Sequence, residues 1–181
     1  MTLYLISLVF LLFILLFIIA RIIYTNFIEP GAIYYPTPDL AVKNMLKLAK
    51  VNSKDTVLDL GSGDGRFLIE ASRLGATSIG YEIDPLLVRQ TRKAIKKTKL
   101  SNLATVKCKS LWHANFSQAT IIVLYLFPNY MNRLQKILDK KLDHPVLLVS
   151  HDYQFPHKKY LKKQDNLYLY KFTPKKNAKN S

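Results

Sequence analysis

The chain has 181 residues, a length typical of one domain, and 49% of them are apolar, as in a globular protein. Its 27 Lys and Arg residues outnumber 12 Asp and Glu residues, for a formal net charge of +15. A single cysteine, Cys108, excludes an internal disulfide and fits a reducing compartment.

The N-terminal segment is strongly apolar. No charged residue occurs between Leu3 and Ala20, and continuation to Tyr24 gives a helix longer than about 30 Å, enough to cross a bilayer. We therefore predict a transmembrane anchor over residues 1–24. A cleaved signal peptide and a buried core helix are the alternatives. The signal peptide is disfavoured because no basic residue precedes the apolar core and because Arg21 follows Ala20.

The positive charge predicts an orientation for this anchor. Basic residues follow the apolar segment and none precedes it, so the N-terminus is expected outside and the domain in the cytoplasm. The expected location is the cell (inner) membrane, with a single pass, or the mitochondrial inner membrane in a eukaryote.

Basic residues are concentrated in residues 86–100 and 157–181. An anionic lipid surface is the favoured partner for these segments, because a tethered domain already lies beside it. A solvated face without a partner is the alternative, and nucleic acid is the less favoured partner.

After a linker at residues 25–35, the pattern alternates between strand and helix. This alternation predicts an α/β fold, a Rossmann-like sheet with helices on both faces, over residues 36–172, followed by a basic tail at residues 173–181. Thr37 is expected to cap a first helix, with Pro38 at its first position. The expected strands are 56–60, 78–82, 104–107, 120–126 and 146–150, with a last pair near 160 and 167–172, and the later helices are 66–74, 85–97 and 129–142.

The turn after the first strand predicts a ligand site. Gly61, Gly63 and Gly65 alternate with Ser62 and Asp64, and Asp59 ends the strand before them. Glycines let a ligand approach the backbone closely, and the following helix offers unpaired N–H groups. Two carboxylates would repel the pyrophosphate of NAD but suit a ligand that carries an ammonium and a sulfonium. The turn therefore favours S-adenosylmethionine as the cofactor.

The second strand supports this interpretation. Glu82 lies at its carboxyl end, where a carboxylate can accept hydrogen bonds from both hydroxyls of a ribose. Asp84 is expected to cap the helix that Pro85 begins. We expect no metal site.

The fourth predicted strand ends beside the glycine turn. Its apolar residues fit a central parallel strand, so the segment from Tyr125 to Pro128 is expected to border the transferred methyl group. His151 and Asp152 follow the fifth strand at the same edge, where either can relay a proton; structural roles are the alternative for both residues and for Tyr125.

Several motifs together resemble one enzyme family. They are Tyr35-Pro36-Thr37-Pro38, Asp59 to Arg66, Gly80-Tyr81-Glu82 with Pro85, Leu111-Trp112, Tyr125 to Pro128, and Val149 to Asp152. In this pattern the chain resembles the seven-strand lysine methyltransferases that act on the adenine nucleotide translocase and the ATP synthase c subunit, with their short prokaryotic relatives. The resemblance implies that Ser110 and Leu111 contact the adenine. The family usually has Asp where this chain has Ser110, so weaker cofactor binding is expected. Tyr35, Pro36 and Thr37 are expected to bind the substrate.

The predicted function is methylation of a lysine on a membrane protein by a membrane-anchored, S-adenosylmethionine-dependent enzyme. A methyltransferase for a quinone or lipid and a non-catalytic cofactor-binding module are the alternatives. The short domain leaves little chain for a lid over a small acceptor, which favours a protein substrate.

Overall fold

A computed structural model describes residues 2–23 and 34–174. The chain divides into two compact units, Met1–Ile33 and Tyr34–Ser181, each described by itself. Most of the predicted linker, residues 25–33, and most of the predicted basic tail, residues 175–181, lie outside the described residues.

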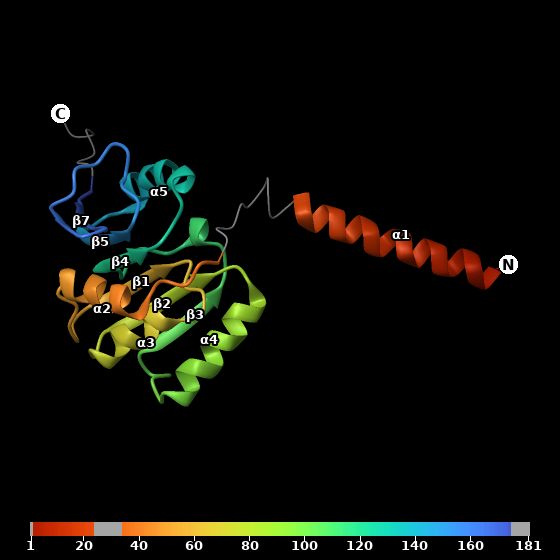
Figure 1. Cartoon of the computed structure of the whole chain (residues 1–181), viewed down its shortest axis with the longest axis horizontal. Helices are drawn as coiled ribbons and strands as arrows, with labels where there is room; N and C mark the ends of the chain where they lie inside the picture. Colours follow the sequence, from red (N-terminus) through yellow and green to blue (C-terminus); the bar gives the residue numbers. More distant parts are fainter. Residues whose placement is uncertain (1, 24–33, 175–181) are drawn as a thin grey trace. The chain divides into compact units, whose positions relative to one another are not determined.

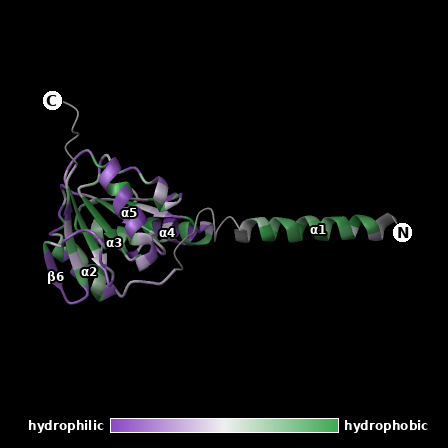
Figure 2. Ribbon diagram, turned by 90° about the horizontal axis from the view of Figure 1, so that it is seen from above, coloured by the Kyte–Doolittle hydropathy of each residue, from purple (hydrophilic) through white to green (hydrophobic). Residues whose placement is uncertain are grey.

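The first unit contains one helix, α1 (Thr2–Ile23), whose described side chains are mostly apolar (Figure 2). Within the described residues, none of the helices has the length and apolar character that crossing a membrane requires. The transmembrane helix predicted at residues 1–24 is therefore wrong.

The second unit is built on a seven-stranded sheet with the order β3-β2-β1-β4-β5-β7-β6 (Figure 1). Strands β1 to β5 are parallel, whereas β7 runs antiparallel to both β5 and β6. The strands are β1 (Thr56–Leu60), β2 (Thr77–Glu82), β3 (Ala104–Cys108), β4 (Ile121–Leu124), β5 (Val146–His151), β6 (Lys162–Gln164) and β7 (Leu167–Phe172). This is the predicted Rossmann-like sheet.

Helices cover both faces of this sheet: α2, α3 and α4 lie on one side of the strands and α5 on the other (Figure 1). Their bounds are α2 (Asp39–Leu48), α3 (Arg66–Arg73), α4 (Pro85–Lys97) and α5 (Pro128–Lys141), and a short 3-10 helix, η2, spans Leu111–His113. Each helix packs an apolar stripe against the core, such as Val88 and Ile95 of α4, and its opposite face is exposed to water.

Two local predictions are corrected. Thr37 does not cap α2: the N-cap position is Pro38, without a side-chain hydrogen bond, and the Thr37 carbonyl instead accepts a hydrogen bond from Arg66. Strand β4 ends at Leu124 rather than at residue 126. Residues 125–127 leave the sheet because they lead into α5, which begins at Pro128. Proline suits the first position of a helix, where the backbone N–H has no partner within the helix.

Strands β1 and β4 are buried on both faces and lie side by side, with Asp59 in register with Val123. The carboxyl ends of parallel strands open at one edge of the sheet. The chain following β1, β2, β4 and β5 therefore meets at this edge, where the predicted site residues lie.

Candidate active site

The turn after β1 contains three glycines in left-handed conformations. Gly61, Gly63 and Gly65 have φ values of 92°, 52° and 82°. A Cβ on Gly65 would lie 2.4 Å from the Thr91 methyl carbon, and Thr91 Oγ1 donates a 2.9 Å hydrogen bond to the Gly63 carbonyl. The turn needs glycine at Gly65 both for its backbone angle and for close packing against α4.

Glu82 holds this turn against the end of β2. Its Oε2 accepts a 2.8 Å hydrogen bond from the Gly63 N–H, and its Oε1 accepts a 2.9 Å bond from the Asp84 N–H. Each carboxylate oxygen can accept a further hydrogen bond, so this geometry leaves acceptor capacity for a ribose hydroxyl.

Asp59 is buried at the end of β1, and its Oδ2 has no hydrogen-bond partner among the described residues. Burial, followed by the charges of Glu82 and Asp64, raises the pKa of Asp59 well above its usual value. The Ser62 hydroxyl, in the glycine turn, is also buried and without a partner in the described part of the chain. Unsatisfied buried polar atoms are costly, so these two atoms indicate a polar, cationic ligand at the turn.

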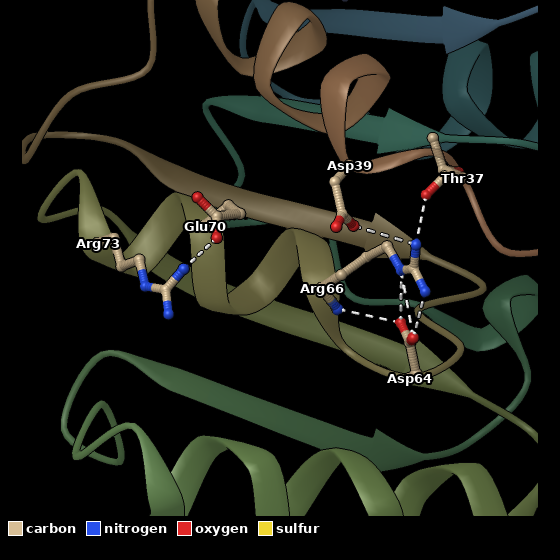
Figure 3. A network of polar contacts seen from close by, with 6 residues as sticks. All are labelled: Thr37, Asp39, Asp64, Arg66, Glu70 and Arg73. Carbon is tan, nitrogen blue, oxygen red and sulfur yellow. Dashed lines mark hydrogen bonds and ion pairs between the residues drawn. The ribbon is translucent and has the colours of Figure 1, made fainter.

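Asp64 forms an ion pair with Arg66 instead of facing the turn with a free charge (Figure 3). The two side chains lie 2.6 Å apart at Arg66 Nη2 and Asp64 Oδ2. Burial alone would raise the pKa of Asp64, but the hydrogen bonds and charge of Arg66 outweigh it, and the net shift is downward. Arg66 Nη1 also donates to the Thr37 carbonyl at 2.7 Å and contacts Asp39 at 3.2 Å, which joins α3 to the start of α2.

Ser110 and Leu111 follow β3, next to the end of β2. Both are buried, and the Lys109 N–H donates to the Glu82 carbonyl at 2.9 Å, which keeps the two strand ends together. Trp112 packs against α5 instead: its ring centroid lies 5.9 Å from that of Tyr130, and the Arg133 guanidinium lies 4.2 Å from it.

A second group of side chains lies where β4 and β5 end. The Tyr125 ring contacts His151, Tyr35 and Tyr153, with centroid distances of 4.4, 6.0 and 6.2 Å. Phe127 extends the group, 6.1 Å from Tyr153. We call these residues, Tyr35, Tyr125, Phe127 and Tyr153, the aromatic cluster. Burial, followed by the hydrogen bond and charge of Asp152, raises the pKa of Tyr125, so its hydroxyl stays protonated and donates.

His151 and Asp152 lie beside this cluster. The His151 side chain is 7% exposed, and burial lowers the pKa of His151 although the charge of Asp152 opposes this shift. The ring is therefore neutral near pH 7. Asp152 has a φ of 62° at the centre of a tight turn, in which the Tyr153 N–H donates to the His151 carbonyl at 2.8 Å. Asp is one of the few residues besides glycine that adopt a positive φ readily, so it suits the centre of this turn.

The remaining predicted residues, Pro128 and Tyr35 to Thr37, lie near the aromatic cluster or near Arg66. Pro128 is the first residue of α5, beyond the aromatic cluster. Tyr35 is in that cluster, Pro36 follows it, and Thr37 is buried at the Arg66 contact.

Sequence reasoning missed two residues of this edge. Tyr153 follows Asp152 and contacts Tyr125, and Asn166 reaches them from the turn between β6 and β7. Tyr153 was detectable as an aromatic neighbour of a predicted position. Asn166 was not, because its sequence context indicates only a turn.

The residues at the glycine turn fit S-adenosylmethionine. A buried carboxylate with one oxygen unpaired among the described residues suits a cationic ligand, and Glu82 retains acceptors for a ribose. In the described part of the chain no group of three or more His, Cys, Asp or Glu residues could hold a metal ion.

Comparison with known proteins agrees with this ligand. Residues 59–162 match the model of the ANTKMT methyltransferase domain. A protein-lysine N-methyltransferase of Saccharolobus islandicus is 32% identical over 127 residues, which are 69% of this chain and 79% of the relative. The human lysine N-methyltransferase of the ATP synthase c subunit is 30% identical over 124 residues, 68% of this chain, and the match spans about half of that protein, 53%.

Among solved structures, an RNA methyltransferase from Salinibacter ruber in complex with S-adenosyl-L-homocysteine is similar. It is 36% identical, with a TM-score of 0.73, and the match covers 81% of this chain and 98% of that one. S-adenosyl-L-homocysteine is what S-adenosylmethionine becomes after it has lost its methyl group.

Proposed function

Because this chain belongs to the ANTKMT methyltransferase domain family, we propose that it methylates the side-chain amine of a lysine on a membrane protein. The resemblance seen in the sequence is confirmed by the family match, and the chain is an S-adenosylmethionine-dependent methyltransferase. We propose in addition that the acceptor is a lysine, that this lysine belongs to a membrane protein, and that the reaction takes place at a membrane.

One observation supports a lysine as the acceptor. The hydroxyl of Tyr125, the carboxylate of Asp152 and several aromatic rings lie beside the glycine turn. A Cβ on Gly61 would lie 3.8 Å from a Leu126 methyl carbon, so the turn borders the residues that follow β4. Tyr125 begins that segment, with Asp152 next to its hydroxyl. A carboxylate attracts an ammonium, and aromatic faces favour a cation near them.

When bound, S-adenosylmethionine supplies an electrophilic methyl group on a positively charged sulfur. The lysine nitrogen needs a free lone pair, so its ammonium, with an unperturbed pKa of about 10.4, must first lose a proton. Asp152 lies where it can attract the ammonium and pass its proton to solvent. Tyr125 does not serve as the base, because burial and Asp152 raise the pKa of its hydroxyl.

The membrane substrate is supported by the vertebrate relatives, whose names specify the ATP synthase c subunit. The basic residues of α4 and its end, Arg89, Arg92, Lys93, Lys96, Lys97 and Lys99, are all exposed. Such a helix attracts an anionic lipid surface. We therefore place the site of action at the cytoplasmic face of a cell membrane, or its mitochondrial equivalent, with anionic lipid as a partner.

An RNA acceptor is a second candidate. It is favoured by the likeness to the RNA methyltransferase of Salinibacter ruber and by the same basic surface, which would also attract phosphates. Phosphate contacts alone would not select a methylation site, so the aromatic cluster would have to bind a base.

The test uses purified full-length protein, S-adenosylmethionine labelled in its methyl group, and membranes and total RNA from the source organism. We expect label in a protease-sensitive membrane band and, by mass spectrometry, on lysine. The Asp59→Ala variant is the control for activity of the added enzyme. Label sensitive to ribonuclease would favour RNA, and label extracted into organic solvent would favour a quinone or lipid; either result would overturn the lysine proposal.

A further inference from the structure

The turn between β6 and β7 reaches the end of β5 through one side chain. The side-chain Nδ2 of Asn166 lies 3.2 Å from His151 Nε2 and also donates to Asp152 Oδ1. In addition, the main-chain carbonyl of Asn166 accepts a 2.8 Å hydrogen bond from the Asp152 N–H. One residue from a hairpin that follows later in the chain therefore contacts both His151, the last residue of β5, and Asp152, the residue after it.

The carboxylate of Asp152 decides which way this amide points. A carboxylate only accepts hydrogen bonds, so the NH₂ group of Asn166, and not its oxygen, must face Asp152. The same NH₂ group faces His151 Nε2, which must then be an acceptor without a hydrogen. The neutral imidazole consequently carries its proton on Nδ1.

This proton lies on the side of Asp152. His151 Nδ1 is 3.5 Å from Asp152 Oδ2 and has no hydrogen-bond partner among the described residues. The N–H dipole thus points its positive end at the carboxylate without neutralising it. The carboxylate of Asp152 can thus face a cation that approaches beside the Tyr125 hydroxyl.

We infer that Asn166 is a positioning residue, which sets the Nδ1–H tautomer of His151 and orients the Asp152 carboxylate toward the acceptor amine. The role toward the amine rests on the proposed function, whereas the tautomer does not. The described groups that contact the imidazole are Asp152 from its own segment, Tyr125 from the end of β4, and Asn166 from the hairpin.

The test is nuclear magnetic resonance of full-length protein labelled with ¹⁵N in its four histidines. The nitrogen shifts report which ring nitrogen carries the proton. We expect Nδ1–H in the wild type. In Asn166→Asp, a carboxylate replaces the donor opposite Nε2, so we expect the proton on Nε2 and a higher pKa of His151. In Asn166→Ala, we expect the Nε2–H form to gain population.

His144 provides an internal control in the same spectra. Its Nε2 lies 2.7 Å from the Ala119 carbonyl, far in sequence from Asn166, so its signals should not change in either variant if the fold is intact. A wild-type His151 with its proton on Nε2, or an unchanged tautomer in both folded variants, would overturn the inference.

Kinetic measurements test whether Asn166 orients the Asp152 carboxylate toward the acceptor amine. With the methyl acceptor identified by the labelling experiment, Asn166→Ala should lower kcat by about tenfold, as expected for the loss of a charge-assisted hydrogen bond, and leave the Kd of S-adenosylmethionine unchanged. An equal loss of cofactor affinity would contradict a role on the acceptor side. If no lysine is labelled, the proposed function fails, while the histidine spectra still decide the tautomer.

Discussion

The Gly63 N–H donates a 2.8 Å hydrogen bond to Glu82 Oε2, which joins the glycine turn after β1 to the end of β2. Glu82 thus has a structural partner in addition to the ribose that its position suggests. Its second oxygen accepts from the Asp84 N–H, so two backbone donors depend on one buried side chain.

Replacing Glu82 by Ala should weaken S-adenosylmethionine binding by at least tenfold, because a charge-assisted hydrogen bond contributes about 1.5–3 kcal/mol. Glu82→Gln should also weaken binding, since an amide has one acceptor oxygen for two N–H donors. Calorimetric titration measures both. The control is Glu70→Gln on α3, which removes a carboxylate that pairs with Arg73 (Figure 3). Unchanged affinity in a folded Glu82→Ala variant would rule Glu82 out as a cofactor ligand.

Asp59→Asn should stabilise the protein without cofactor while weakening cofactor binding by at least tenfold. Burial, then the charges of Glu82 and Asp64, raises the pKa of Asp59 in the folded state. The folded protein then holds a proton that the unfolded chain releases above about pH 4. Wild-type stability from this group therefore falls as the pH rises from about 4 through the raised pKa.

Thermal unfolding at several pH values checks the Asp59 prediction. The Tm of Asp59→Asn should exceed that of the wild type by a margin that grows as the pH rises above about 4, and about 1 kcal/mol corresponds to a few degrees. A Tm difference that shrinks with rising pH would show that Asp59 is ionised in the folded protein without cofactor.

Arg66→Lys should loosen the connection between the glycine turn and the start of α2. A lysine cannot make the paired contacts with Asp64 and donate to the Thr37 carbonyl at the same time. We expect a loss of about 1 kcal/mol in the free energy of unfolding, measured by urea denaturation, because the pair is partly exposed.

Arg73→Lys, on the same helix but with one surface partner, is the matched control and should change stability by a few tenths of a kcal/mol at most. Equal losses in the two variants would mean that the Thr37 contact contributes nothing measurable.

Tyr125→Phe should lower kcat by about tenfold and leave the Kd of S-adenosylmethionine unchanged. The ring stays in contact with His151, but the hydroxyl that faces Asp152 is lost. Tyr170→Phe removes a hydroxyl that accepts from the Phe155 N–H and serves as the control away from this edge. A wild-type kcat in Tyr125→Phe would restrict Tyr125 to packing.

Exchanging Lys93, Lys96 and Lys97 for Glu should reduce binding of the full-length protein to vesicles containing phosphatidylserine. Each exposed basic residue near an anionic surface contributes about 1 kcal/mol, a contribution that salt screens. Binding to neutral phosphatidylcholine vesicles is the reference and should not change. Equal sedimentation of the variant and the wild type with acidic vesicles would exclude α4 as the lipid-binding surface.

Much of the fold is determined by the sequence within short segments. Helix α4 begins at Pro85, with the Asp84 side chain accepting from the Leu86 N–H, and ends at Lys97, as its proline, cap and apolar spacing predict. The turn at Gly61, Gly63 and Gly65 was also predictable, because glycine has no side chain and adopts a positive φ without strain. Hydrophobic length alone was a poor guide at residues 1–24, where the described residues contain no membrane-spanning helix.

Tertiary structure alone decided which polar groups face each other. The charge of Asp64 is taken up by Arg66, which also contacts the Thr37 carbonyl far from it in the chain. Asn166 reaches His151 because β7 pairs antiparallel with β5, with His151 opposite Leu167. Hydrophobic spacing and turn preferences depend on neighbours within a few residues, whereas these contacts depend on how distant strands pair. The cofactor turn could therefore be predicted from the sequence, and the Asn166 contacts with His151 and Asp152 could not.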